Sequence, residues 1–133
     1  MSAARNRELM EIYLHEVLAK RAFERIEEIA APDLVDHLQP TLRGPAALDA
    51  HARGFCENTP EVAIEVVRIF ATEDTAVGIW RWSGTPKYPS TTSAKGTPVS
   101  PRLIASVFQI EDGRVRDYRV FVDALDVFTQ LAQ

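Results

Sequence analysis

The stretch RVRDYRVFVDALD, from Arg114 to Asp126, contains a β-strand pattern followed directly by the start of a helix. Its first part alternates polar and apolar residues, which is typical of a strand with one buried face. The Asp-Gly pair just before it is a strong signal for a hairpin turn, with residues 102–110 as the partner strand. Asp123 is placed to cap a helix over residues 124–131, and Asp126 lies in the first turn of that helix.

Toward the N-terminus the sequence predicts two further long strands, and before them helices and one short strand. Residues 62–70 and 75–82 are rich in β-branched and aromatic residues, and DLVDHLQP forms a short strand that ends at Pro40. Apolar residues recur at helical spacing over residues 4–20, and a shorter helix follows that Pro32 should stop. Another helix begins at Pro45, a good first-turn residue. Helices grouped before an antiparallel sheet predict one α+β domain over residues 1–133.

This order of elements predicts a strongly curved sheet wrapped over the early helices, forming a cone with a pocket. Residues 84–100 carry three prolines, two glycines and many hydroxyl groups, so they are predicted to form a long loop without strands. Loops of this length often serve as a lid or rim over a site.

Composition excludes several classes of function. With 46% hydrophobic and 26% charged residues, the chain of 133 residues is ordinary for a soluble globular protein. A net charge of −4 argues against a nucleic-acid partner. No apolar run reaches membrane-spanning length, and the one cysteine, Cys56, predicts a reducing, cytoplasmic location and an inert thiol. The three histidines show no metal-type spacing, so we expect no metal and no cofactor.

Three stretches resemble the SnoaL-like polyketide cyclases of the nuclear-transport-factor-2-like (NTF2-like) superfamily. They are APDLVDHLQPTLRGPAALDAHARGF, VGIWRWSGT and VFQIEDGRVRDYRVFVDALDVFTQL, and they follow one another in the family's order. The resemblance implies an NTF2-like cone and a homodimer formed through the open sheet face. It also implies a small hydrophobic substrate of polyketide or terpene type. The superfamily includes cyclases, isomerases, dehydratases, epoxide hydrolases and non-enzymatic binders, so the fold alone does not give the reaction.

The chain departs from the family at two positions that matter for catalysis. Aldol-cyclase members resemble Asp-His-Arg-Asp-Trp-Pro-Asp where this chain reads DYRVFVD, so the family's general acid/base falls on Val120. The family's cavity histidine on the preceding strand falls on Ser106. Valine transfers no proton and an unactivated serine is a poor base, so the family's aldol cyclisation is not expected with these groups.

Three residues are the candidates to replace that proton chemistry. Tyr118 shares a strand face with Val120 and Arg116, and its phenol is placed to donate a hydrogen bond to a substrate carbonyl unless it is simply a core tyrosine. His37 and Asp36 are the acid/base candidates. Because they are neighbours on a strand, they should point to opposite faces and form no dyad.

The remaining predicted substrate-binding residues have structural alternatives. Trp80 and Trp82 form either core or an aromatic wall, and Tyr13 either packs or points its hydroxyl into the cone. Asp123 is expected to be a helix cap before it is a site residue, and Arg102 either binds an anionic group or marks the loop exit. Ser106 and Val120 complete the set, whereas His15 and His51 read as solvated helix residues.

Two hypotheses follow from the sequence. The first is a cofactor-independent cyclase or isomerase that moves a proton in a dry pocket, with epoxide hydrolysis as an alternative reaction. The second is a non-catalytic module that binds a small molecule or dimerises. Convergence of Asp36, His37 and Tyr118 in one pocket would favour the first hypothesis.

Overall fold

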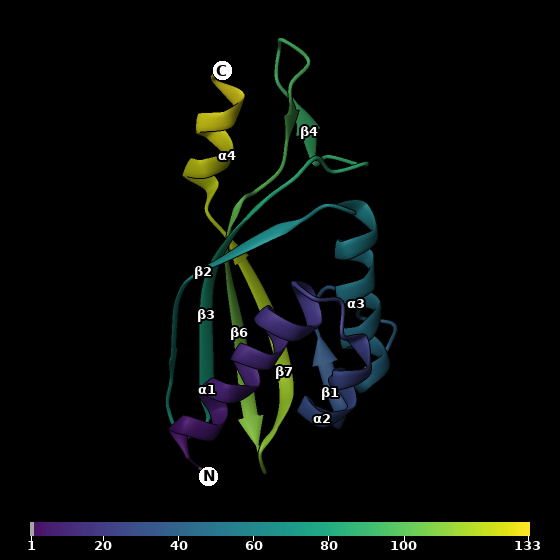
Figure 1. Cartoon of the computed structure of the whole chain (residues 1–133), viewed down its shortest axis with the longest axis vertical. Helices are drawn as coiled ribbons and strands as arrows, with labels where there is room; N and C mark the ends of the chain where they lie inside the picture. Colours follow the sequence, from purple (N-terminus) through teal and green to yellow (C-terminus); the bar gives the residue numbers. More distant parts are fainter. Residues whose placement is uncertain (1) are drawn as a thin grey trace.

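A five-stranded sheet in the order β1-β7-β6-β3-β2 organises the computed structural model, which describes residues 2–133. Strands β2 (Ala63–Ala71), β3 (Thr75–Ser83), β6 (Leu103–Glu111) and β7 (Arg114–Val122) pair antiparallel, and β1 (Ala30–Asp36) lies parallel to β7. The sheet is curved and not closed, and helices cover its inner face, so the predicted α+β, NTF2-like architecture is confirmed (Figure 1).

Helices lie on one face of this sheet. Helix α1 (Ala3–Glu11) continues into the π-helix η1 (Ile12–Leu18), followed by the 3-10 turn η2 (Phe23–Arg25) and α2 (Ile26–Ile29). Helix α3 (Pro45–Asn58) packs beside β1, while α4 (Ala124–Leu131) stands beyond the ends of the sheet, near the loop that holds β4 (Thr91–Thr92) and β5 (Pro98–Val99) (Figure 1). No helix among residues 2–133 is long and apolar enough to cross a membrane.

The contact between α1 and the sheet is close because β3 carries a glycine there. A Cβ atom added to Gly78 would lie 2.8 Å from Leu14 Cδ1 and 2.9 Å from Met10 Cγ. Real side chains do not approach so closely, so Gly78 is what lets the first helix sit on the strand. Leu14 and Met10 are both fully buried as a result.

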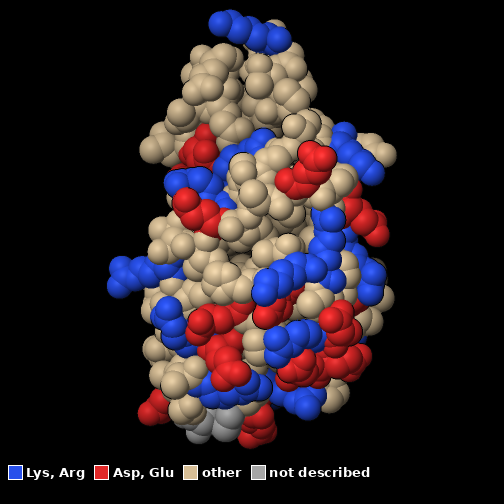
Figure 2. Space-filling view, viewed as in Figure 1, with Lys and Arg blue, Asp and Glu red and all other residues tan. Residues whose placement is uncertain are grey.

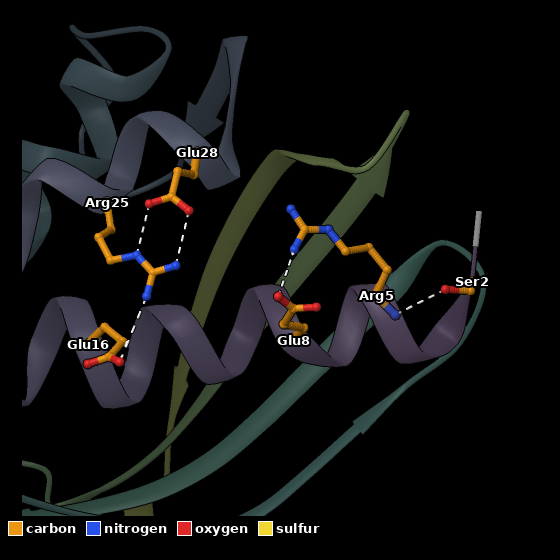
Figure 3. A network of polar contacts seen from close by, with 6 residues as sticks. All are labelled: Ser2, Arg5, Glu8, Glu16, Arg25 and Glu28. Carbon is orange, nitrogen blue, oxygen red and sulfur yellow. Dashed lines mark hydrogen bonds and ion pairs between the residues drawn. The ribbon is translucent and has the colours of Figure 1, made fainter.

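Ion pairs on the helices connect η2 with its neighbours η1 and α2. Arg25 contacts Glu28 through its Nε at 2.8 Å and Glu16 of η1 through its Nη1 at 3.8 Å, while Arg5 pairs with Glu8 within α1 (Figure 3). These groups are exposed or half-buried, and ion pairs in contact with solvent contribute little to the stability of a fold.

The chain differs from the sequence-based prediction around Pro32. The helix was expected to be stopped by this proline, but it ends at Ile29, and Pro32 lies inside β1. This position is tolerated because β1 is an edge strand whose register with β7 shifts between Ala30 and Val35.

A second irregularity lies in β7. The register between β6 and β7 shifts between Gln109 and Ile110, which produces a bulge opposite them. Val115 and Tyr118 are therefore both buried although they are three residues apart. The expectation that Arg116 shares the inner face with Tyr118 is wrong, because the bulge turns Arg116 outward, where it pairs with Asp33 at 2.7 Å.

The long loop is also more ordered than predicted. Residues 91–92 and 98–99 pair as the small sheet of β4 and β5, so the expectation of a loop without strands is wrong. Helix α4 begins at Asp123, whose side chain accepts hydrogen bonds from the backbone N–H groups of Leu125 and Asp126, which confirms the predicted cap.

Candidate active site

A small pocket lies between η1, α3 and the inner faces of β3, β6 and β7. Its volume is about 70 Å³, and its walls are almost entirely aromatic or aliphatic. The lining residues are Tyr13, Leu18, His51, Phe55, Trp80, Ile104, Tyr118 and Val120. The polar groups on this wall are one imidazole, two phenols and an indole, so the pocket combines an apolar body with few hydrogen-bonding atoms.

His51 and Asp36 form a buried pair at the edge of this pocket. The Nδ1 atom of His51 lies 2.7 Å from Oδ2 of Asp36. The Asp36 carboxylate is 1% exposed and the His51 side chain 17% exposed. The other oxygen of Asp36 accepts the backbone N–H of Leu38 at 2.9 Å, which fixes the carboxylate in place. With Nδ1 bonded to the carboxylate, Nε2 of His51 is available to act on a molecule in the pocket.

Tyr118 stands beside this pair and is tied to β6 and β3. Its ring stacks on His51, with ring centres 5.3 Å apart. Its hydroxyl lies 2.8 Å from Oγ of Ser106, which accepts a hydrogen bond from Nε1 of Trp80 at 3.0 Å. Burial raises the pKa of Tyr118 well above its ordinary value. The phenol therefore stays protonated and serves as a hydrogen-bond donor.

The π-helix η1 places Tyr13 in the same wall. Residues five apart lie roughly 140° apart around an α-helix, whereas a π-helix bonds residues five apart and stacks them on one face. Tyr13 and Leu18 are five apart and both line the pocket. The Tyr13 ring meets Tyr118 edge-on at 5.4 Å, and burial, together with the neighbouring Tyr118, raises the pKa of Tyr13. The sequence pattern predicted a regular helix here and did not reveal the π-helix.

The structure brings most of the predicted site residues together. Tyr13, Trp80, Tyr118 and Val120 line the pocket directly. Asp36 reaches the pocket through His51, and Ser106 lies one hydrogen bond behind Tyr118.

His37 lies outside the pocket. Its Nε2 atom is 2.7 Å from Oδ2 of Asp117, in a pair whose side chains are 37% and 29% exposed. Strand alternation explains the separation, because the neighbouring residues Asp36 and His37 point to opposite sides, as predicted. The predicted catalytic trio is thus split: Asp36 and Tyr118 face the pocket side, and His37 faces the surface.

Three more predicted residues have other contacts. Trp82 donates its indole N–H to the carbonyl of Pro101 at 2.8 Å and does not line the pocket. Arg102 lies over the Trp82 ring at 4.2 Å and donates to the carbonyl of Gly84, which places it at the exit of the long loop. Asp123 caps α4.

The expectation that His51 is a solvated helix residue is wrong. His51 lies three residues after Leu48 and four before Phe55, the spacing of one helix face. Leu48 is fully buried and Phe55 packs edge-on against Trp80. Its position on this apolar stripe was the signal in the sequence that His51 faces inward.

The arrangement suits proton transfer. A carboxylate that holds one nitrogen of an imidazole orients the ring and stabilises its protonated form, as in other acid/base dyads. Among residues 2–133 there is no group of three or more potential metal ligands. Cys56 is buried, and burial raises the pKa of its thiol, as expected of an unreactive cysteine.

Comparison with known proteins assigns this fold to a family. The SnoaL-like domain family matches residues 12–118, so the chain belongs to the SnoaL-like family. A comparison with curated proteins gave no match.

Solved structures with the same fold carry different names. An LEH-like epoxide hydrolase from M. tuberculosis is 18% identical, with 98% of this chain and 91% of that chain covered and a TM-score of 0.68. TsrD from Streptomyces laurentii is 21% identical, with 98% and 97% covered and a TM-score of 0.75. A candidate polyketide cyclase from Acidithiobacillus ferrooxidans is 21% identical, with 97% and 95% covered and a TM-score of 0.69. At these identities the shared property is the fold.

Proposed function

We propose that this protein is a cofactor-independent enzyme that moves a proton within a small apolar carbonyl compound, causing isomerisation or ring closure. The observation that carries the proposal is the buried contact of 2.7 Å between Asp36 and His51 at the edge of an aromatic pocket. This replaces the sequence-based choice of His37 or Asp36 as base: His51 is the base, and Asp36 is the residue that orients it.

The chemistry needs three groups. Nε2 of His51 removes a proton from a carbon next to the carbonyl, and the ionised Asp36 stabilises the imidazolium that forms. Tyr118 donates a hydrogen bond to the enolate oxygen, where negative charge develops. His51 then returns the proton to a different carbon, or the enolate carbon attacks a second carbonyl and the new alkoxide takes the proton.

Val120 fits this scheme because the base lies elsewhere. The family resemblance puts the general acid/base at this position, and Val120 lines the pocket with an aliphatic side chain. The imidazole of His51 comes from α3 and not from β7. A valine there keeps the pocket dry, which strengthens the electrostatic interactions of the dyad.

The size of the pocket limits the substrate. A volume of about 70 Å³ is well below the roughly 300–1,000 Å³ of typical ligand sites. The pocket therefore accepts the reacting end of a polyketide- or terpene-like molecule, or a small ketone, rather than a whole polycyclic substrate.

Hydrogen–deuterium exchange at the carbon next to a carbonyl tests the base. Small cyclic ketones are incubated in D₂O, and NMR follows the loss of the proton. We expect the wild-type protein to accelerate the exchange and His51→Ala to reduce that acceleration at least about 100-fold. His37→Ala is the matched control and should retain the rate. A wild-type protein that leaves exchange at the background rate would contradict the proposal.

Epoxide hydrolysis is the second candidate. The observation in its favour is that a histidine oriented by a carboxylate can also activate water, in a fold shared with an epoxide hydrolase. Turnover of small epoxides to diols, lost in His51→Ala, combined with no exchange on ketones would favour this reaction. Binding of the same compounds without any turnover would favour a non-catalytic binding module.

We further propose that the protein is a cytoplasmic homodimer. Its single cysteine is free, which suits a reducing compartment. The outer side of the sheet carries a groove lined largely by apolar residues, including Ile79, Phe121 and Val122, and the last two are 55% and 52% exposed. On the face that Figure 2 shows, where the helices lie in front of the sheet, charged groups are most frequent in the lower half and few near α4. Light scattering that finds only monomer at micromolar concentration would exclude the dimer, and Phe121→Glu should dissociate it.

A further inference from the structure

We propose that Ser106 and Trp80 are positioning residues that set the direction of a buried hydroxyl chain, so that Tyr118 donates its proton into the pocket. The chain runs from the Trp80 indole through the Ser106 hydroxyl to the Tyr118 phenol. It gives the site a preference for ligands with an oxygen anion or carbonyl oxygen. The inference rests on the pocket of the proposed function and explains how its hydrogen-bond donor is held.

The first link has a fixed direction. An indole N–H can donate but cannot accept, so in the contact of 3.0 Å between Nε1 of Trp80 and Oγ of Ser106 the serine oxygen accepts. The Ser106 proton therefore cannot point toward Trp80, because the indole N–H already occupies that direction.

The second link follows from the lack of any other acceptor. Ser106 is fully buried, and among residues 2–133 its Oγ has hydrogen-bond contacts only with Trp80 and Tyr118. If Tyr118 donated to Ser106, the serine proton would be left buried away from the pocket without a partner, which is costly; if Ser106 donates, the proton left over is that of Tyr118, which lines the pocket. The favoured arrangement has Ser106 donating to the Tyr118 oxygen over 2.8 Å.

The Tyr118 proton is then available to a ligand. A phenol oxygen that accepts one hydrogen bond is a stronger donor of its own proton, because linked hydrogen bonds polarise one another. Tyr118 lines the pocket beside His51, with the two rings stacked. The oxygen of a bound enolate or phenolate at this place would receive a hydrogen bond from Tyr118 with the imidazolium of His51 nearby.

The ionisation of bound 4-nitrophenol tests the chain. Only the ionised probe absorbs strongly in the visible range, so the spectrum of the bound probe near neutral pH reports its ionised fraction. We expect the wild-type pocket to favour the ionised form. Tyr118→Phe and Ser106→Ala should each lower that preference roughly 10-fold, the effect of a hydrogen bond to a charged group, and Trp80→Phe roughly threefold. Ser106→Thr keeps the hydroxyl and should restore most of the preference.

Matched control variants show whether an effect comes from the hydrogen-bond chain or from a general change in packing. Trp82 lies on the same strand face as Trp80 and also packs edge-on against Phe55, but its indole N–H donates to the carbonyl of Pro101. Trp82→Phe therefore removes an indole that is not part of the hydroxyl chain. Ser100→Ala removes another buried serine, away from the pocket. Both should leave the ionised fraction unchanged. In a Tyr118→Phe background, Ser106→Ala should have no further effect, because the chain acts through Tyr118.

Three results would overturn the inference. The first is a wild-type pocket that does not bind 4-nitrophenol or binds its neutral and ionised forms equally well. The others are a wild-type ionised fraction in Ser106→Ala, or additive effects of Ser106→Ala and Tyr118→Phe in the double variant. The outcome is independent of the proposed base. If the pocket prefers the phenolate but the protein does not accelerate ketone exchange, the proposed function is rejected and the hydroxyl chain is kept. If ketone exchange is accelerated without a preference for the phenolate, the function is kept and the hydroxyl chain is rejected.

Discussion

Two histidine–aspartate pairs lie at the junction of β1 and β7, and they differ in surroundings and not in length. His51 with Asp36 and His37 with Asp117 each have a nitrogen–oxygen distance of 2.7 Å. The side chains of the first pair are 17% and 1% exposed, and those of the second are 37% and 29% exposed. The first pair borders an apolar pocket, while the second is partly exposed to solvent, and Arg119 also contacts Asp117 there at 3.6 Å.

This contrast shows that a titratable pair becomes a candidate active site through its environment. Asp36 is the last residue of β1 and His37 follows it directly, while Asp117 and Tyr118 are neighbours in β7 that pair with the end of β1, so alternation sends one residue of each couple inward. The inward residues meet α3 and form the site, and the outward ones form a surface ion pair. Burial strengthens the electrostatic coupling of the first pair and solvent weakens that of the second.

The largest expected difference between the two pairs is catalytic. His51→Gln should lower kcat for ketone exchange at least about 100-fold, because the general base is lost. His37→Gln, the same change in the exposed pair, should alter kcat less than about twofold. Steady-state kinetics on both variants, with circular dichroism to confirm folding, makes the comparison. An equal loss in the two variants would show that the pocket pair has no special role.

The next largest difference is expected in the free energy of unfolding when Asp36 or Asp117 is replaced. Asp36→Ala leaves His51 and the N–H of Leu38 without their buried acceptor, and breaking a buried pair costs about 3 kcal/mol. Asp117→Ala removes an exposed partner and should change the free energy of unfolding by at most about 0.5 kcal/mol. Urea unfolding measures both. Similar losses in the two variants would mean that burial does not distinguish the pairs.

Much of the fold could be predicted from the sequence because its signals are local. The Asp-Gly turn, the alternation in residues 114–122 and the cap at Asp123 depend on neighbours a few positions away. The bulge in β7, the proline inside β1 and the π-helix were not predictable in this way. Each depends on how an element pairs or packs after folding, and hydrophobic spacing alone does not encode it.

The candidate site was predicted in part for the same reason. Tyr118, Asp36 and Val120 were found from strand alternation and family resemblance. The spacing of His51 on the apolar stripe of its helix indicated that it faces inward, but its pairing with Asp36 could not be predicted, because the two lie 15 residues apart and only the contact between α3 and β1 brings them together. The choice of His37 followed the motif, which does not say which of two neighbouring residues faces inward.

Asp126 is a third aspartate for comparison, because its carboxylate is held by backbone N–H groups and not by a histidine. Asp126 of α4 accepts the backbone N–H groups of Arg102 and Leu103 at 2.7 and 3.2 Å. Partial burial alone would raise its pKa, but these hydrogen bonds outweigh it and hold the pKa of Asp126 below the ordinary value. The stabilisation is therefore complete above the ordinary carboxyl pKa and is lost as the pH falls through the lower folded-state pKa.

The Asp126→Asn variant should lack this acid-dependent change and lose about 1 kcal/mol of stability near neutral pH. Amide exchange in residues 124–131, measured between about pH 6 and pH 3, should rise on acidification in the wild type and stay nearly constant in the variant once corrected for intrinsic rates. Parallel curves for the two proteins would show that Asp126 does not anchor α4.

The smallest expected effect is the response of the two pairs to salt. A double-mutant cycle on His37 and Asp117 should give a coupling of about 0.5 kcal/mol at low salt. That coupling should fall toward zero in 1 M salt, because the Debye length shrinks to about 3 Å. The cycle on His51 and Asp36 should give a larger coupling that salt hardly changes, because solvent ions cannot surround a carboxylate that is 1% exposed. If the buried coupling also fell with salt, water would have to reach the dyad, and the dry pocket that the proposed proton transfer requires would not exist.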